Sequence, residues 1–142
     1  MNKRKIRVMV YGTFDILHPG HLNFLRQAKR LGDFLIVSVS RDVNAKKFKG
    51  YYPVFGEKER LAIVSSLKYV DQAVLGGRSH YLAHTLKLKP DIVALGYDQR
   101  AYERHLRADI KSGKLKVRLT RLASYQSGKY KSTRYKKLIR QG

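Results

Sequence analysis

The stretch IRVMVYGTFDILHPGHLNFLRQAKRLG, residues 6–32, contains the pattern that decides the fold. It begins with a short apolar run, Ile6 to Tyr11, which predicts a buried strand. After a loop at residues 12–21, apolar side chains recur every three residues along one face of a helix that we expect to end at Gly32; they are Leu22, Leu25, Ala28 and Leu31. The stretch therefore predicts a strand, a loop and a helix in succession.

The same alternation continues along the chain. Further strands are predicted at residues 34–40, 70–75, 91–95 and 115–120, and further helices at residues 57–67, 80–88 and 101–110, with a basic loop at residues 46–53. Because nearly continuous apolar strands alternate with helices, we expect an α/β fold: a Rossmann-like, doubly wound, five-stranded parallel sheet with helices on both faces. Residues 1–142 are predicted to be a single domain, in which residues 123–142 form a basic tail that includes a short helix.

Composition limits the classes of protein to consider. The 142 residues are 43% apolar, enough for one packed core, so a wholly disordered or collagen-like chain is excluded. A formal net charge of +21 predicts a phosphate-rich partner, either a nucleotide, a nucleic acid or an acidic membrane surface. The absence of cysteine excludes a disulfide framework and a cysteine nucleophile, and favours the cytoplasm. No apolar run approaches the roughly 20 residues of a membrane span, so no membrane partner is expected.

The loop GTFDILHPGH, residues 12–21, is the first candidate for chemistry, since ligands of open α/β sheets bind beyond the carboxyl ends of the strands. Pro19 and Gly20 lie near the start of the predicted helix, where free backbone N–H groups favour a phosphate. His18 and His21 flank this point, and imidazoles can donate hydrogen bonds to phosphoryl oxygens. No third metal ligand follows this H-x-x-H spacing nearby, so no protein metal site is predicted.

At these residues the sequence resembles the HxGH nucleotidyltransferase superfamily, which includes glycerol-3-phosphate cytidylyltransferases, phosphopantetheine adenylyltransferases and archaeal-type FAD synthases. The resemblance implies transfer of a nucleoside monophosphate from an NTP to a phosphorylated acceptor, with release of pyrophosphate. It also implies that Thr13 and Phe14 line the nucleotide, that His18 and His21 contact its phosphates as catalytic residues, and that Gly20 leaves room for the base or ribose.

Two basic segments extend the resemblance. SVSRDVNAKKFKG, residues 38–50, is similar to the acceptor and phosphate loop of the family, which implies that Lys46 neutralises charge at the reacting phosphates. We expect Lys47 and Lys49 to be solvated. KSTRYKKLI, residues 131–139, resembles the motif that holds the outer phosphates of the NTP. Ser132 and Thr133 would have that role, although a serine here is also a common helix N-cap.

The segment GYDQR, residues 96–100, favours one subfamily. It resembles the matching segment of archaeal-type FAD synthases, in which an aspartate placed as Asp98 and a tyrosine placed as Tyr125 contact ATP. The reaction implied is transfer of AMP from ATP to FMN, with Mg²⁺ or another divalent cation carried by the NTP, and a homodimer is the usual form of the family.

Two alternatives remain at this point. One is a CTP-dependent glycerol-3-phosphate cytidylyltransferase, because a single sequence does not display the hydrogen bonds that read the base; phosphopantetheine is a further, less favoured acceptor. The other is a basic RNA-binding module, since tyrosines and lysines interleave in the tail. Nucleic-acid binding is disfavoured because such a module has no need of GTFDILHPGH.

Overall fold

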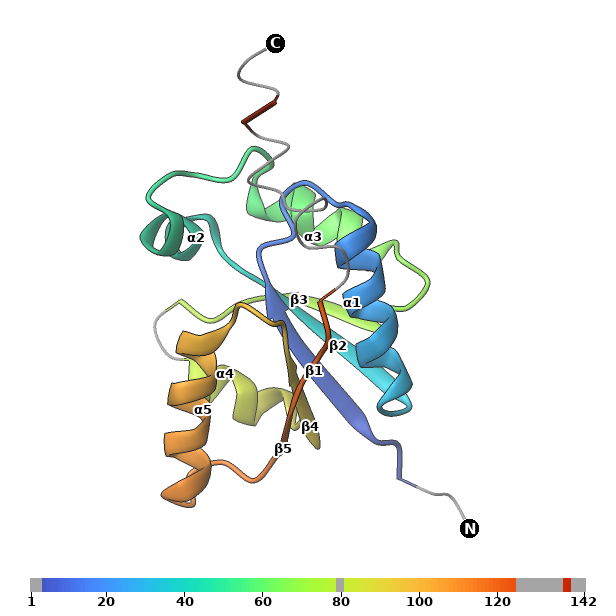
Figure 1. Cartoon of the computed structure of the whole chain (residues 1–142), viewed down its shortest axis with the longest axis vertical. Helices are drawn as coiled ribbons and strands as arrows, with labels where there is room; N and C mark the ends of the chain where they lie inside the picture. The colour runs from blue at the N-terminus through green and yellow to red at the C-terminus, as the bar shows by residue number, and fades with distance from the viewer. Residues whose placement is uncertain (1–3, 79–80, 125–136, 139–142) are drawn as a thin grey trace.

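A computed structural model describes residues 4–78, 81–124 and 137–138 of the chain. Five parallel strands form one sheet in the order β3-β2-β1-β4-β5 (Figure 1). The strands are β1 (Arg7–Gly12), β2 (Phe34–Val39), β3 (Gln72–Leu75), β4 (Ile92–Leu95) and β5 (Arg118–Arg121). The helices are α1 (Pro19–Arg30), α2 (Asp42–Lys49), α3 (Glu57–Ser65), α4 (Tyr81–Leu88) and α5 (Arg100–Lys111).

The central strand β1 supplies residues to both sides of the core. Val8 and Val10 pack in one apolar cluster with residues of α1 and α3, while Met9 and Tyr11 pack in a second cluster with residues of α4 and α5. This is the period-two alternation of a strand that is covered on both faces. Helices α1 and α3 therefore cover one face of the sheet and α4 and α5 the other (Figure 1). The prediction of a doubly wound five-stranded parallel sheet is confirmed.

The strand order reverses direction at β1. The chain passes from β1 through α1 to β2 and β3 on one side, and returns through α4 to β4 on the other side of β1. The loops that follow β1 and β4 consequently leave the sheet in opposite directions, which opens a crevice at their carboxyl ends.

The structure corrects the prediction for residues 46–53 and shortens the last strand. Residues 46–49, which include Lys46, Lys47 and Lys49, belong to helix α2, Asp42–Lys49, which lies at the carboxyl end of the sheet beside α3 (Figure 1). The helix ends at Gly50, whose φ of 82° is left-handed and favours glycine. Strand β5 is Arg118–Arg121, so it begins three residues later and ends one residue later than the strand predicted at residues 115–120. In the described part of the chain no helix is both long and apolar enough to cross a membrane.

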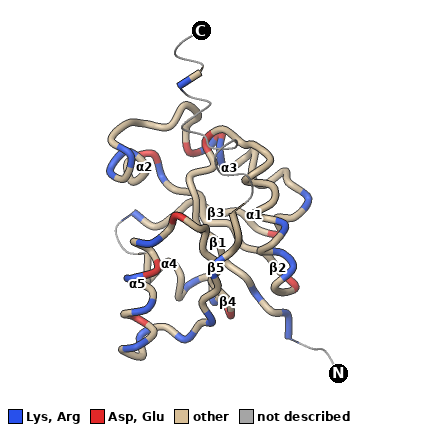
Figure 2. Tube along the Cα trace, viewed as in Figure 1, with Lys and Arg blue, Asp and Glu red and all other residues tan. Residues whose placement is uncertain are grey.

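Lysine and arginine residues occur along α2, α5 and the N-terminal end of the chain (Figure 2). Most of the predicted tail, residues 125–136 and 139–142, lies outside the described residues. The predictions for Tyr125, Ser132 and Thr133 lie there too.

Candidate active site

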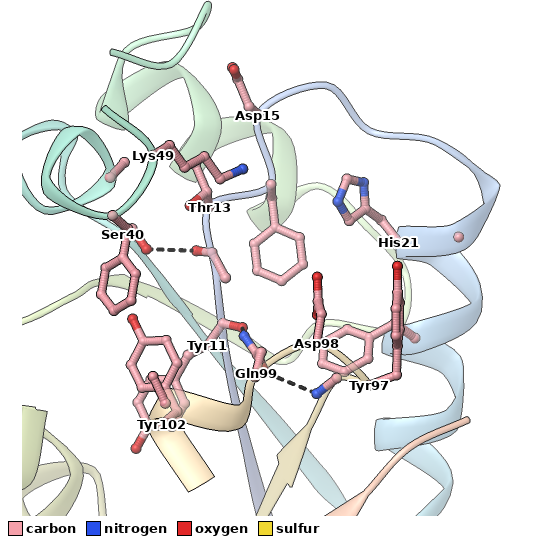
Figure 3. A pocket seen from close by; sticks show the side chains of 18 of the residues that line it. Tyr11, Thr13, Asp15, His21, Ser40, Lys49, Tyr97, Asp98, Gln99 and Tyr102 are labelled. Atoms are coloured by element: carbon pink, nitrogen blue, oxygen red, sulfur yellow. Dashed lines mark hydrogen bonds between the residues drawn. The ribbon is translucent and has the colours of Figure 1, made fainter. Parts of the chain in front are cut away.

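A cavity of about 490 Å³ lies at the reversal point of the strand order. It is lined by residues of the loop after β1, of α1, of α2, of the loop between β4 and α5, and by Ala123 and Ser124 after β5 (Figure 3). These segments are far apart in the sequence and meet because all the strands are parallel. The prediction that ligands bind at this end of the sheet therefore has a cavity to support it.

Gly12 and Phe14 set the path of the loop after β1. Phe14 has a φ of 51°, a left-handed backbone conformation that is uncommon for a residue with a side chain. Its buried ring lies directly over Gly12, where an added Cβ atom would come within 2.4 Å of the ring. Residue 12 is therefore restricted to glycine by this close approach, and the Phe14 ring forms part of the cavity lining.

Two buried charged side chains hold this loop against the segment before α3. The Asp15 carboxylate, 2% exposed, accepts hydrogen bonds from the N–H groups of Val54 and Phe55 at 2.8 and 2.9 Å. The Arg60 guanidinium, completely buried, donates to the carbonyl oxygens of Thr13 and Phe55 at 2.8 and 2.9 Å. Arg60 also forms an ion pair with Asp42, at 2.7 Å.

His18 is the N-cap of α1. Its Nδ1 atom accepts a hydrogen bond from the N–H group of Gly20 at 3.1 Å. Because Nδ1 is the acceptor, the proton of the neutral imidazole resides on Nε2, which leaves Nε2–H as a donor. Burial lowers the pKa of His18, which favours this neutral form. The residue thus both caps the helix and presents a hydrogen-bond donor at the end where an anion is favoured.

The His21 imidazole lies against that of His18, with ring centroids 3.9 Å apart and the ring planes tilted by 30°. Its Nδ1 atom is buried and has no hydrogen-bond partner among the residues that the structure describes. Burial, together with the charges of His18 and Lys49, lowers the pKa of His21 to about 3. A buried polar atom that lacks a partner is costly. Such an unpaired atom is expected where a bound polar ligand supplies the missing hydrogen bond.

Lys49 and His21 extend toward one another from α2 and α1 (Figure 3). Lys49 lines the cavity together with Asn44, Ala45 and Phe48, which share one face of α2. Lys46 is not among the lining residues; its Nζ atom lies over the ring of Tyr52, 4.4 Å from the centroid.

The loop between β4 and α5 also lines the cavity. Asp98 is exposed and points into the cavity beside Tyr97 (Figure 3). The side chain of Gln99 connects β1 to the end of β4. Its Nε2 atom donates to the carbonyl oxygen of Tyr11 and its Oε1 atom accepts from the N–H group of Gly96, both at 2.9 Å. Arg121 donates to the carbonyl oxygen of Tyr97 at 2.8 Å. The loop is therefore fixed at both ends.

The sequence model of the cytidylyltransferase-like family matches residues 9–138 of the chain. The chain belongs to this cytidylyltransferase-like family. The resemblance stated for GTFDILHPGH is thereby confirmed.

Relatives of this cytidylyltransferase-like chain carry a more specific name. A protein of Thermoplasma volcanium named FAD synthase is 42% identical over 134 residues, which is 94% of each chain. A protein of Methanothrix thermoacetophila with the same name is 46% identical over 117 residues, covering 82% of this chain and 80% of the relative. A crystal structure described as the lipopolysaccharide core biosynthesis protein from Thermoplasma volcanium has a TM-score of 0.81 and 43% identity, covering 87% of this chain and all of that one.

The cavity brings together part of the predicted site. Its lining includes Thr13, Phe14, His18, Gly20, His21 and Asp98, while Pro19 is the first residue of α1. Lys46 is placed elsewhere, and Tyr125, Ser132 and Thr133 lie outside the described residues. Within the described ranges no group of three or more His, Asp or Glu side chains is arranged to hold a metal ion.

Sequence reasoning did not assign a site role to Lys49, to Gln99 or to the two buried charged side chains Asp15 and Arg60. For Lys49 a usable signal existed, because Asp42 at the start and Gly50 at the end are typical boundaries of a short helix. For Gln99, Asp15 and Arg60 no signal existed, since isolated polar side chains in loops and helices are usually solvated.

Proposed function

We propose that this cytidylyltransferase-like protein is an FAD synthase, which transfers AMP from ATP to FMN and releases pyrophosphate. The observation that carries the proposal is that His18, His21 and Asp98 line one cavity at the start of α1 in a chain whose relatives, 40–46% identical, are named FAD synthase. A helix start with two imidazoles suits a phosphate chain, and the loop between β4 and α5 suits a nucleoside.

In the proposed reaction, a phosphate oxygen of FMN attacks the α-phosphorus of ATP in line with the leaving group. The new P–O bond joins the two nucleotides, and the bond from the α-phosphorus to the bridging oxygen breaks, so pyrophosphate leaves with the electron pair. No nucleophile from the protein is needed. Catalysis then consists of positioning and of stabilising negative charge on the transferred phosphoryl group.

The described side chains divide these tasks. His18 directs its Nε2–H donor to the α-phosphoryl oxygens, at the N-terminal end of α1, where the helix dipole favours negative charge. The N–H groups of Gly20, His21 and Leu22 are already bonded to His18, so they are not part of this proposal. His21 provides a buried ring nitrogen whose hydrogen bond is completed by bound phosphate. Lys49, on the cavity face of α2, supplies the positive charge that the sequence interpretation had given to Lys46.

Asp98 is proposed to bind the nucleoside of ATP, since it points into the cavity from the loop between β4 and α5. Mg²⁺ enters as part of the substrate, bound to the triphosphate. Contacts of Tyr125, Ser132 and Thr133 with ATP stay predictions, as do a homodimer and a cytoplasmic location.

The test is incubation of the purified protein with ATP or CTP, each with FMN or glycerol 3-phosphate, in the presence of Mg²⁺. The expected result is that ATP with FMN gives FAD and an equal amount of pyrophosphate, and that the other three substrate pairs give no product. CDP-glycerol from CTP and glycerol 3-phosphate would establish the cytidylyltransferase alternative. Absence of pyrophosphate from every pair, together with RNA affinity that falls steeply with salt, would favour the RNA-binding module.

The variant His18→Ala is the control for this experiment. Product formation that is lost in the variant comes from this cavity. Formation that persists unchanged comes from a contaminating enzyme.

A further inference from the structure

A second cavity, of about 550 Å³, lies between α2, α4, α5 and the loop after β3. It shares six lining residues with the first cavity: Tyr11, Ser40, Asn44, Phe48, Ala101 and Tyr102. Because both cavities are lined by these side chains, a ligand in one lies directly against a ligand in the other. Among the described residues of the nucleotide prediction, none lines the second cavity; these residues are Thr13, Phe14, His18, Pro19, Gly20, His21 and Asp98.

Three of the shared side chains form a column of aromatic rings. The rings of Tyr11 and Tyr102 are stacked with centroids 5.4 Å apart and an interplanar angle of 3°. Phe48 continues the column, 5.6 Å from Tyr102 at an angle of 17°. The Tyr11 hydroxyl is hydrogen-bonded to buried Thr85, which fixes the inner end of the column. Phe48 at the outer end is 67% exposed, so it offers a large uncovered surface for a further planar ring.

Polar groups face the second cavity at fixed positions. The Oγ atom of Ser38, a residue only 3% exposed, is 2.8 Å from Nε2 of His84. The Tyr81 hydroxyl donates to the Asp109 carboxylate at 2.6 Å. This end of the cavity combines aromatic and aliphatic surface with a few positioned hydrogen-bonding groups, which is the usual composition of a site for a heteroaromatic ligand.

The proposed function requires the acceptor to meet the α-phosphorus from outside the ATP site. Reacting atoms must come within about 3–3.5 Å of each other in line, so the phosphate of the acceptor has to lie at the residues shared by the two cavities. The remainder of the acceptor then extends between α4 and α5. We infer that the second cavity is the acceptor site and that it takes a phosphorylated planar heteroaromatic molecule, the flavin of FMN, with its ring system against Phe48 and Tyr102. This inference rests on the proposed function.

The dimensions also discriminate between acceptors. A three-carbon acceptor such as glycerol 3-phosphate would occupy a small part of a cavity of about 550 Å³ and leave the aromatic column uncovered. A flavin would cover that apolar surface, and burial of such surface stabilises a complex.

The first experiment measures FMN binding without turnover. Flavin fluorescence is titrated with wild type, Phe48→Leu and Phe48→Trp, with and without a non-hydrolysable ATP analogue. We expect saturable quenching in wild type, equal or tighter binding to F48W, and binding to F48L weakened about threefold to tenfold, the range for one aromatic contact. Val43→Ala, at an exposed position of α2 that lines neither cavity, is the matched control and should leave FMN binding unchanged. Equal FMN affinity of wild type, F48L and F48W would overturn the inference.

The second experiment uses two leucines of α4. Leu82 lines the second cavity, whereas Leu86, one turn later, is exposed and lines neither cavity. Leu82→Trp fills the acceptor space, so the KM for FMN should rise about tenfold or more while the KM for ATP stays within about twofold. Leu86→Trp should behave as wild type. A rise in both KM values for L82W, or in neither, contradicts the assignment.

The two failures can be told apart. Suppose that the wild-type protein forms FAD, but that the FMN affinity is the same in F48L and F48W and the KM for FMN is the same in L82W. The proposed function is then supported and the assignment of this acceptor site is refuted. A wild-type protein that forms no FAD refutes the proposed function, and the titration then decides by itself whether the cavity binds a flavin. If L82W does not fold, His105→Ala, which enlarges the same cavity from α5, replaces it with the same expected rise in the KM for FMN.

Discussion

Gln99 joins strands β1 and β4 at the point where the crevice opens, with its Nε2 atom 2.9 Å from the carbonyl oxygen of Tyr11. Through Oε1 it also holds the N–H group of Gly96, at the end of β4, at 2.9 Å. One side chain therefore pairs a backbone group of each strand just where their ladder ends. Since the cavity is lined by residues on both sides of this link, the link sets the spacing between the loop after β1 and the loop after β4.

Gln99→Leu should therefore weaken both the fold and nucleotide binding. Loss of the amide leaves two backbone groups without that partner, at a cost of about 1–3 kcal/mol in the free energy of unfolding. The KM for ATP should rise several-fold because the Asp98 loop loses its anchor. Urea unfolding and initial rates measure the two effects. Arg100→Leu, at the next, exposed position, is the control, and an effect of equal size there would remove the special role of Gln99.

His18 should have two separable roles. His18→Ala removes the helix cap, which costs about 0.5–2 kcal/mol of stability, and removes the Nε2–H donor, which lowers kcat by about 10²-fold. His18→Asn keeps a capping acceptor without an imidazole. We expect it to recover the stability measured by urea unfolding but not the kcat. Recovery of both by asparagine would mean that His18 acts only as the cap of α1.

Asp98→Asn should raise the KM for ATP and leave the dependence of the rate on Mg²⁺ unchanged. The reason is its place on the cavity-lining loop between β4 and α5, in a chain whose described residues form no acidic cluster for a metal. Initial rates over a matrix of ATP and Mg²⁺ concentrations distinguish the two effects. A shifted Mg²⁺ optimum with an unchanged KM for ATP would show that the carboxylate acts on the metal.

The architecture, and the position of His18 and His21 at the start of a helix beside a cavity, were predictable because their signals are local and repeated. Short apolar runs alternate with segments whose apolar side chains recur every three residues, and this alternation of strands and helices predicts a parallel sheet. A parallel sheet with this connectivity brings its carboxyl-end loops together. The placement of His18 and His21 at a helix start followed from Pro19 and Gly20. None of these inferences needed a long-range contact.

The parts that were missed depend on long-range contacts or on the rotation of one helix. Arg60 and Asp15 are buried because backbone groups distant in the sequence satisfy them, and nothing nearby in the sequence marks those partners. Residues 42–49 have three lysines and few apolar side chains, so their helical period is weak and the segment was interpreted as a loop. Without the helix, the side of the segment on which Lys46 and Lys49 lie could not be assigned.

The pKa of His21 predicts how stability depends on pH. The folded protein holds His21 neutral down to a pH of about 3, whereas the unfolded chain binds a proton near 6.5. Between these values the unfolded state binds more protons, so the contribution of His21 to stability is present above about 6.5 and is lost progressively as the pH falls toward about 3. His21→Gln removes this dependence. Urea unfolding of both proteins at several pH values should show their difference shrinking or reversing on acidification; a constant difference would mean an ordinary pKa.

Lys49 and Lys46 form a matched pair for the final prediction, because both are exposed on α2, less than one turn apart. Lys49 is on the face that lines the cavity and acts electrostatically on His21, so Lys49→Met should lower kcat/KM for ATP and FMN by about tenfold or more. Lys46 lies over Tyr52, an exposed contact worth about 0.5–1 kcal/mol, so Lys46→Met should change the rate by less than about twofold.

Initial rates of FAD formation compare these two variants with wild type, and thermal unfolding confirms that neither exchange alters the fold. The reverse outcome, with activity lost in K46M and kept in K49M, would restore the role that the sequence resemblance implies for Lys46. It would also require α2 to rotate when the triphosphate binds, because Asn44, Ala45, Phe48 and Lys49 could not then keep the face that they present to the cavity. Equal losses in both variants would instead indicate that the phosphates respond to the summed charge of α2 rather than to one ammonium group.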